Sequence, residues 1–297
     1  YISVTGGGEK ATFRISGGYD RETGSVIEQQ LDRLSTRVAL DYFVSDRIKI
    51  STNFALTYTK NKKNYDDLLS IAYKKMPNMS IYEQDPLTGA DTGKYYTMLQ
   101  TASSVFKDDQ MQYVNPVASA KLAKFDDRTY DITPELELNY RLLGMDEQSW
   151  QLNWQGRVYM NIFNEYVDRF YPNELVTVPW TSGVNLASSS NTKSVAFNTK
   201  QTLTLIPHFN NEDHSLMAMG RFELTSGSSN GQSSDASGLP AGGITSPDAG
   251  GLITGVSSSF SQWRSMFYTF SMHYAYKSRY MFDFSVRADG TTKFGPD

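Results

Sequence analysis

The sequence contains no cysteine among its 297 residues. This absence excludes a disulfide framework, thiol catalysis and a thiolate metal site. The sequence also has no run approaching the roughly 18 apolar residues that a membrane-spanning helix requires. Spanning by helices is therefore excluded, whereas spanning by β-strands is left open.

The sequence has no excess of basic over acidic residues. The formal net charge is -4 and the sequence pI is about 5.5, which argues against a nucleic-acid partner, because phosphates require basic surfaces. The mean hydropathy of -0.46 is typical of a soluble chain. A β-barrel gives the same average, since every second strand residue faces a polar lumen.

Aromatic residues are abundant, at 13% of the chain, and they alternate along the last hairpin. Segments 266–276 and 280–290 flank the turn Lys277-Ser278-Arg279. One face of this hairpin is apolar and aromatic, whereas the other carries His273, Lys277, Asp283, Arg287 and Asp289. A charged inner face and an aromatic outer face predict an all-β fold, a segment of an antiparallel transmembrane β-barrel.

Alternation of this kind predicts ten strands that are joined by five short turns. The turns are 7–10, 45–46, 144–149, 210–213 and 277–279. The connections between hairpins are much longer, and three stand out, at about 61–117, 163–191 and 226–261. Short turns on one rim and long loops on the other are typical of outer-membrane barrels, with the long loops extracellular.

The first long loop has local structure of its own. Apolar spacing predicts a helix over 65–75, with Asp66 and Asp67 near its start and Pro77 ending it. Asp85-Pro-Leu-Thr-Gly89 is predicted to form a turn. Within the strand expected over 121–143, Pro134 indicates a bulge or a locally unpaired position.

Charged residues of the strands share the predicted inner, lumen-facing side. Cross-strand ion pairs are a simpler interpretation of them than a ligand site. The lumen-facing polar residues are Arg14, Arg37, Asp131, Glu135, Glu137, Arg157, Asp283 and Arg287, and Arg141 is a further candidate for pairing.

Aromatic residues fall into two groups. Those at strand ends suit a girdle at the membrane interface, where an apolar ring carries a polar tip; they are Tyr42, Tyr58, Tyr140, Trp150, Tyr276 and Tyr280. Four loop aromatics, Tyr82, Tyr95, Tyr96 and Trp180, are candidates for ligand binding. Stacking on a sugar and packing against another domain or partner are both open for these four.

No residue pattern indicates an enzyme. His208, His214 and His273 lack metal spacing, and the acidic pairs, such as Asp66 with Asp67, show no geometry for an acid and a base across a pocket. Accordingly, no catalytic residue, metal or cofactor is expected.

Several segments also resemble a known family. These segments are 6–19, 33–40, 115–118 and, most specifically, 278–295, which contains Arg287-Ala-Asp-Gly290. They are similar to the SusC/RagA group of TonB-linked (TonB-dependent) outer-membrane transporters of Bacteroidetes, and region 66–89 resembles the long extracellular loop of these proteins. In the strand before Arg287-Ala-Asp-Gly290, this sequence has Tyr268 and Phe270 where the family is expected to have smaller or charged residues.

The resemblance implies a barrel of about 22 strands that is closed by a plug domain. It also implies a SusD-like surface lipoprotein as partner, import of oligosaccharides or peptides, and energy delivered through TonB. On this interpretation, residues 1–297 form a middle part of the barrel wall in the outer membrane of a Gram-negative bacterium, and the plug and TonB box are expected to lie outside this sequence.

Two alternatives from other classes are open at this stage. One is a surface glycan-binding or adhesin β protein without transport. The other is a soluble β-sandwich enzyme, which would remain monodisperse without detergent.

Overall fold

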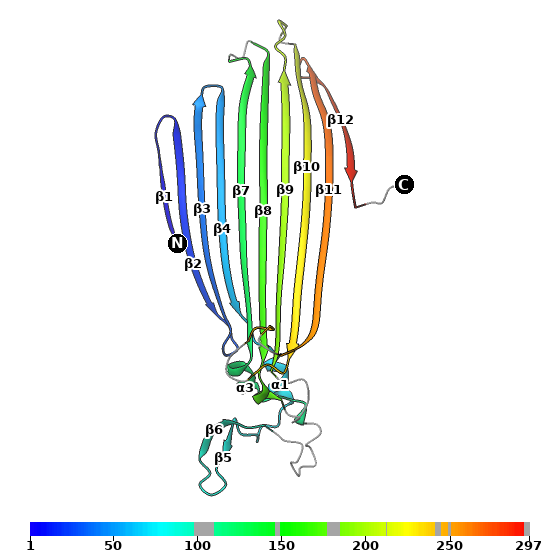
Figure 1. Cartoon of the computed structure of the whole chain (residues 1–297). Coiled ribbons are helices and arrows are strands. Elements are labelled where there is room, and N and C mark those ends of the chain that lie inside the picture. The colour runs from blue at the N-terminus through cyan, green and yellow to red at the C-terminus, as the bar shows by residue number, and fades with distance from the viewer. Residues whose placement is uncertain are drawn as a thin grey trace.

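In the computed structural model, ten strands form one antiparallel sheet (Figure 1). The structure describes residues 1–97, 110–145, 149–176, 185–211, 213–240, 245–248 and 251–293. Strand order follows chain order, β1-β2-β3-β4-β7-β8-β9-β10-β11-β12. The strands are β1 (Ile2–Gly7), β2 (Ala11–Thr23), β3 (Gln30–Ser45), β4 (Ile48–Lys62), β7 (Lys124–Leu143), β8 (Gln151–Tyr171), β9 (Leu186–Ile206), β10 (His214–Ser237), β11 (Leu252–Tyr276) and β12 (Tyr280–Thr291). The predicted fold class, an antiparallel β-barrel segment, is confirmed.

Short turns and long connections lie at opposite ends of the sheet (Figure 1). The backbone N–H of Gly8 donates to the carbonyl of Ala11 at 2.8 Å in the first turn. In the last turn, Lys277 and Ser278 adopt positive φ angles of 51° and 53°, as a tight hairpin turn requires. Helices α1 (Leu68–Lys74) and α3 (Pro116–Leu122) lie at the loop end.

Several strands run further than the sequence indicated. The connection between β2 and β3 is short and covers only residues 24–29. Likewise, β8 ends at Tyr171 and β9 begins at Leu186, which shortens the predicted loop 163–191. The loop predicted over 226–261 is wrong for most of its length, because β10 continues to Ser237 and β11 begins at Leu252.

Serine explains the largest of these differences. In this part of β10 small polar residues occupy both faces, and in β11 the few apolar residues, Leu252, Ile253, Val256 and Phe260, are interspersed with serine, threonine and glycine, so neither strand shows a regular apolar alternation. The strands pair through their backbones, and the hydroxyls add cross-strand bonds, such as Ser233 to Ser257 at 2.7 Å. Backbone hydrogen bonds between the strands therefore extend β10 and β11 into segments whose sequence does not show a strand pattern.

The first long loop folds into a small subdomain against the end of the sheet. Its core consists of Val114, Ala118, Ala123 and Leu175, packed by Tyr65, Ile71, Tyr95, Leu122 and Tyr171. Leu175 comes from the short 3-10 helix η1 (Asn173–Leu175), which follows β8. The subdomain is thus attached to the rim through a neighbouring strand.

Helix α1 confirms the helix predicted over 65–75, with a later start. Asp67 caps it by accepting a hydrogen bond from the Ser70 N–H at 3.3 Å. The predicted turn at Asp85 is also present, because the Asp85 carboxylate accepts from the N–H groups of Leu87 and Thr88. This turn connects β5 (Tyr82–Gln84) and β6 (Asp91–Tyr95), a small hairpin that the sequence did not indicate.

Pro134 is locally unpaired, as predicted. Pairing of β7 with β8 skips Thr133 and Pro134 and keeps the same register on both sides of this gap, and it shifts between Arg141 and Leu143. On the other side of β7, Pro134 still aligns with Phe54 of β4. Proline has no N–H to donate to the ladder. No helix in the described part of the chain is long and apolar enough to cross a membrane.

Candidate functional site: a two-faced barrel wall

The outward face of the sheet carries an apolar band that crosses all ten strands. Register places Val38, Phe54 and Pro134 side by side across three strands. Many large apolar side chains on this face are exposed; Phe284, for example, is 45% accessible and Val286 is 52% accessible. An exposed apolar surface of this extent needs a nonaqueous partner, and the band is typical of the lipid-facing side of a barrel.

Aromatic side chains border this band. Five of the six predicted interface residues lie on the outward side, with Tyr58 toward the loop end and the other four toward the short-turn end; the four are Tyr42, Tyr140, Tyr276 and Tyr280. Trp150 lies in the turn just before β8 and is exposed. The ring centroids of Tyr58 and Tyr130 are 4.8 Å apart. Sequence reasoning did not assign Tyr130 to this border, although its place two residues before Ile132 in the alternating series was the available signal.

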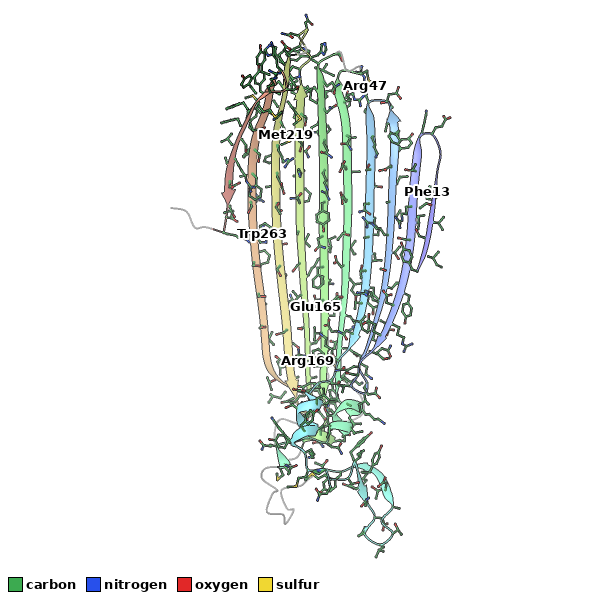
Figure 2. All side chains as sticks on the ribbon, turned by 180° about the vertical axis from the view of Figure 1, so that it is seen from behind. Phe13, Arg47, Glu165, Arg169, Met219 and Trp263 are labelled. Carbon is green, nitrogen blue, oxygen red and sulfur yellow. The ribbon has the colours of Figure 1, made fainter. Side chains whose placement is uncertain are left out.

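The opposite face is polar. Strand register places on it all eight residues predicted to face the lumen, namely Arg14, Arg37, Asp131, Glu135, Glu137, Arg157, Asp283 and Arg287. Side chains project from both faces along the whole sheet (Figure 2). The two-residue period of a strand thus separates polar from apolar side chains.

Hydrogen bonds and ion pairs connect neighbouring strands on the polar face. Arg157 pairs with Glu135 at 2.7 Å, which confirms one of the expected cross-strand ion pairs. Glu137 instead accepts from Asn139 at 2.8 Å and Gln155 at 2.9 Å. The Glu137 carboxylate thus has neutral partners, which sequence separation alone did not reveal.

Other polar-face residues also have neutral or local partners. Asp131 accepts from Asn161 at 2.7 Å, and Arg37 donates to Asn53 at 2.9 Å. Arg14 lies within 3.4 Å of the Ser3 hydroxyl. No salt bridge in the described ranges includes Arg141, so the ion pair expected for it is not formed there.

Aromatic rings also contribute to the polar face near β12. The Arg287 guanidinium lies 4.6 Å from the centre of the Phe267 ring and bonds Asp289 at 2.5 Å. Trp263, labelled in Figure 2, covers Gly227, where a Cβ would meet the indole at 2.5 Å. Glycine is required there by this close approach, and the sequence analysis had not singled out either residue.

The histidines form polar contacts rather than a cluster. His273 bonds Asp283 at 2.6 Å, and His214 bonds the Tyr274 hydroxyl at 2.7 Å. Within the ranges that the structure describes, no group of three or more His, Asp or Glu residues is arranged to hold a metal ion.

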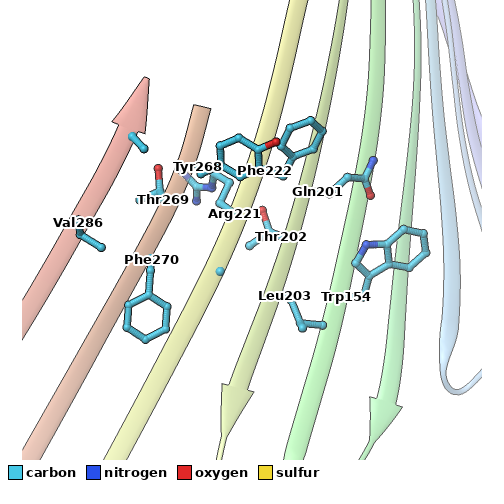
Figure 3. A pocket seen from close by; sticks show the side chains of 12 residues that line it. Trp154, Gln201, Thr202, Leu203, Arg221, Phe222, Tyr268, Thr269, Phe270 and Val286 are labelled. Atoms are coloured by element: carbon cyan, nitrogen blue, oxygen red, sulfur yellow. The ribbon is translucent and has the colours of Figure 1, made fainter. Parts of the chain in front are cut away.

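An apolar groove of about 530 Å³ lies on the outward face (Figure 3). It is open at Gly220, where a side chain would meet nothing within 4 Å. Trp154, Leu203, Phe222, Phe270 and Val286 surround it. Its position on the outward face, and its mostly apolar lining, make it unsuitable for a polar substrate.

Loop aromatics are distributed over the subdomain. Tyr82 and Tyr95 stack on each other across the β5–β6 hairpin, with ring centroids 5.3 Å apart. Tyr95 also packs on the subdomain core, and the Tyr96 N–H donates to the Ile81 carbonyl at 3.0 Å. Trp180 lies outside the described residues. The structure therefore brings Tyr82 and Tyr95 together, and their role in ligand binding stays a prediction.

Two loop residues that sequence reasoning missed hold this subdomain together. The Asn115 side chain accepts from the N–H groups of Val117 and Ala118, and it donates to the carbonyls of Ile81 at 2.8 Å and Tyr96 at 3.2 Å. The Lys75 ammonium donates to the Tyr113 carbonyl at 2.5 Å, and burial lowers the pKa of Lys75 below its ordinary value of 10.5.

An antiparallel sheet with one apolar face, one polar face, short turns at one end and long loops at the other is the wall of an outer-membrane-type β-barrel. No family model matches the chain. In sequence, the chain is 23% identical over 305 residues to TonB-dependent receptor P3 of Formosa agariphila, covering 99% of this chain and 28% of that protein.

Solved structures give the same result for the fold. The RagAB peptide transporter matches with a TM-score of 0.63 and 17% identity, over 99% of this chain and 32% of that one. The RagAB peptide importer in its closed-closed state matches with a TM-score of 0.66 and 18% identity, over 99% and 31%. The predicted resemblance to SusC/RagA-type TonB-dependent receptors is confirmed; these relatives are receptors and transporters rather than enzymes.

The chain spans about a third or less of the length of these relatives. Its similarity therefore concerns the barrel wall.

Proposed function

We propose that this chain is part of the barrel of an outer-membrane importer that takes up oligosaccharides or peptides with energy from TonB. The observation that carries the proposal is the division of the ten-stranded sheet into an apolar and a polar face. Residues 1–297 serve as one panel of a larger plugged barrel, and the plug and the TonB box belong to other parts of the protein.

The polar face supports a role as a passive lumen wall. Its charges have partners across and along the strands, as in Arg157 with Glu135 and Asn161 with Asp131. Groups satisfied in this way provide a hydrated, polar surface. Movement of the substrate and coupling to energy then depend on parts of the protein beyond this wall.

The substrate entrance is proposed to lie at the loop end of the sheet, where the chain forms a folded subdomain. The subdomain built from α1, α3 and the β5–β6 hairpin lies at that end of the sheet (Figure 1). We assign to it contacts with a SusD-like lipoprotein or with the substrate, with Tyr82, Tyr95, Tyr96 and Trp180 as the candidate aromatic residues. The substrate class is supported by family resemblance, and the name of the RagAB relatives specifies peptides for those proteins alone.

A test of this function uses the full-length protein in its native host. Fluorescent oligosaccharides and peptides are supplied to wild-type cells and to cells lacking the gene, with and without a protonophore. The proposal predicts accumulation of one substrate class inside the outer membrane that needs both the gene and the proton-motive force. Surface binding that needs the gene and is insensitive to the protonophore would instead support the adhesin alternative.

A further inference from the structure

Imidazole and thioether side chains come together on the polar face, near the short-turn end of the sheet. On β11, His273 has Met217 of β10 as its direct partner on one side and Asp283 of β12 on the other. Met281 precedes Asp283 by two residues and therefore lies on the same face. His273, Met217 and Met281, here called the Met–His triad, thus come from three neighbouring strands.

The imidazole of His273 is oriented by a carboxylate and keeps one nitrogen free. Its Nδ1 lies 2.6 Å from a carboxylate oxygen of Asp283. Because an ionised carboxylate only accepts hydrogen bonds, Nδ1 carries the proton in this contact. Nε2 has no hydrogen-bond partner in the part of the chain that the structure describes, and the side chain is 40% exposed. A histidine that binds a metal ion usually has this arrangement, with a carboxylate at the other ring nitrogen.

Both methionine side chains are within reach of that nitrogen. Directly opposed residues of a sheet have Cβ atoms about 5 Å apart, and diagonal neighbours are about 7 to 8 Å apart, which long side chains can span. Met217 is directly opposite His273, and Met281 is diagonal to it. Ala275 stands directly opposite Met281, and its short side chain leaves space for the thioether beside the imidazole.

The sulfur atoms of the triad are accessible and have no other polar contact. Met217 is 46% exposed and Met281 is 65% exposed, and neither sulfur accepts a hydrogen bond within the described ranges. Met219, which Figure 2 labels near the same end of the sheet, is different, because its sulfur lies 3.6 Å from a guanidinium nitrogen of Arg221. A cation already occupies that thioether, so Met219 is not a member of the triad.

We propose that the Met–His triad binds a soft monovalent metal ion, copper(I), through the Nε2 atom of His273 and the sulfur atoms of Met217 and Met281. Thioethers are soft ligands that select copper(I), whereas zinc prefers thiolate, imidazole and carboxylate ligands. Three neutral ligands suit a single positive charge, and the Asp283 carboxylate behind the imidazole supplies the opposing charge. This binding goes beyond the proposed import function and does not depend on it.

The test uses the full-length protein in detergent without oxygen, titrated with copper(I) in competition with the chromophoric chelator bicinchoninate. The triad variant combines Met217→Leu with Met281→Leu, which removes both sulfur atoms and keeps apolar side chains of similar size. The control, Met266→Leu with Met272→Leu, makes the same change on the outward face of β11. We expect the triad variant to bind one copper(I) ion fewer than the wild type, and the control to bind as many as the wild type does.

Two results would overturn the proposal: equal copper(I) binding by the triad variant and the wild type, or an equal loss of copper(I) in the triad variant and the control. The second result would mean that any pair of methionines on β10 to β12 binds the ion in detergent. Titration with zinc(II) adds a check on the ligand type, because the triad variant should bind as much zinc(II) as the wild type. Loss of zinc(II) from the triad variant would contradict a thioether site.

If the triad variant does not assemble, the wild type still gives an answer through protection from oxidation. Silver(I) is a soft monovalent ion like copper(I), and a thioether that binds it resists conversion to the sulfoxide by hydrogen peroxide. We expect silver(I) to slow the oxidation of Met217 and Met281 and to leave that of Met145, which is exposed in a short turn, unchanged. Peptide mass spectrometry measures each sulfoxide. Equal oxidation of Met217 and Met281 with and without silver(I) would overturn the proposal.

Discussion

At the residue scale, neighbouring positions on β12 lie on opposite faces of the sheet, one apolar and one polar. Phe284 and Arg287 are three residues apart and lie on opposite faces, since their partners on β11 are Met272 and Thr269. Phe284 belongs to the apolar band, whereas Arg287 bonds Asp289 and covers Phe267. The two positions should therefore respond to substitution in opposite ways.

We predict that Phe284→Arg impairs membrane assembly, because a charge on the lipid face costs about 2 to 4 kcal/mol near the bilayer centre. Arg287→Ser should assemble normally, since a hydroxyl suits the polar face. Heat-modifiable migration of the full-length protein on gels measures assembly. Equal assembly of the two variants would mean that the faces are assigned wrongly.

A buried loop residue gives a pH-dependent prediction. Burial depresses the pKa of Lys75 in the folded state below 10.5, so the unfolded chain binds this proton more tightly than the folded chain. The subdomain should therefore gain stability as pH rises from the depressed pKa toward 10.5. Competitive acetylation across a pH series should give Lys75 a lower titration midpoint in the folded protein than in the denatured protein. Identical midpoints would contradict the burial of this ammonium group.

Residue-level prediction from sequence succeeded where a strand face alternates. The eight polar-face residues and five of the border aromatics lie on the predicted faces of the sheet because one alternating residue fixes every other on its strand. The partners of Glu137 were not predictable, since they depend on the register between β7 and β8. The same holds for the position of Trp263 over Gly227.

At the element scale, strand ends and short helices show the limits of sequence patterns. Helix α3 was missed because its seven residues are too few to show an apolar period and follow a loop. The serine-rich ends of β10 and β11 were missed because they lack apolar alternation. Elements that are stabilised mainly by backbone pairing or by one capping residue have no apolar periodicity, so the sequence pattern does not predict them.

Asn115 is the residue that holds α3 in place. We predict that Asn115→Ala destabilises the loop subdomain by about 1 to 3 kcal/mol, because it removes the helix cap, the side-chain donor of the Tyr96 carbonyl and one of two donors of the Ile81 carbonyl. Hydrogen exchange at Val117 and Ala118 in the full-length protein should accelerate accordingly. The matched variant Asn115→Ser keeps a capping acceptor and loses the bonds to Ile81 and Tyr96, so its effect should be smaller. Unchanged exchange in Asn115→Ala would contradict this role.

At the scale of the whole molecule, the ten strands form a wall with two free edges. In the sheet, β1 and β12 each have a single neighbour. A free edge exposes unpaired N–H and C=O groups, which are costly in lipid, so each edge is expected to pair with further strands of the same barrel. The wall therefore has two faces and two ends, and the proposed import would need the rest of the barrel.

The central claim is that the aromatic face of this wall meets lipid and the charged face meets water. The absence of cysteine from the chain allows a single spin label to be placed at each position from 266 to 272 on β11, in the full-length protein reconstituted into bilayers and freed of other reactive thiols. Electron paramagnetic resonance then compares collisions with oxygen, which concentrates in lipid, with collisions with a water-soluble nickel complex. We predict a period of two, with labels at 266, 268, 270 and 272 more accessible to oxygen and those at 267, 269 and 271 more accessible to nickel. The reverse pattern, or accessibility without a period of two, would contradict the account.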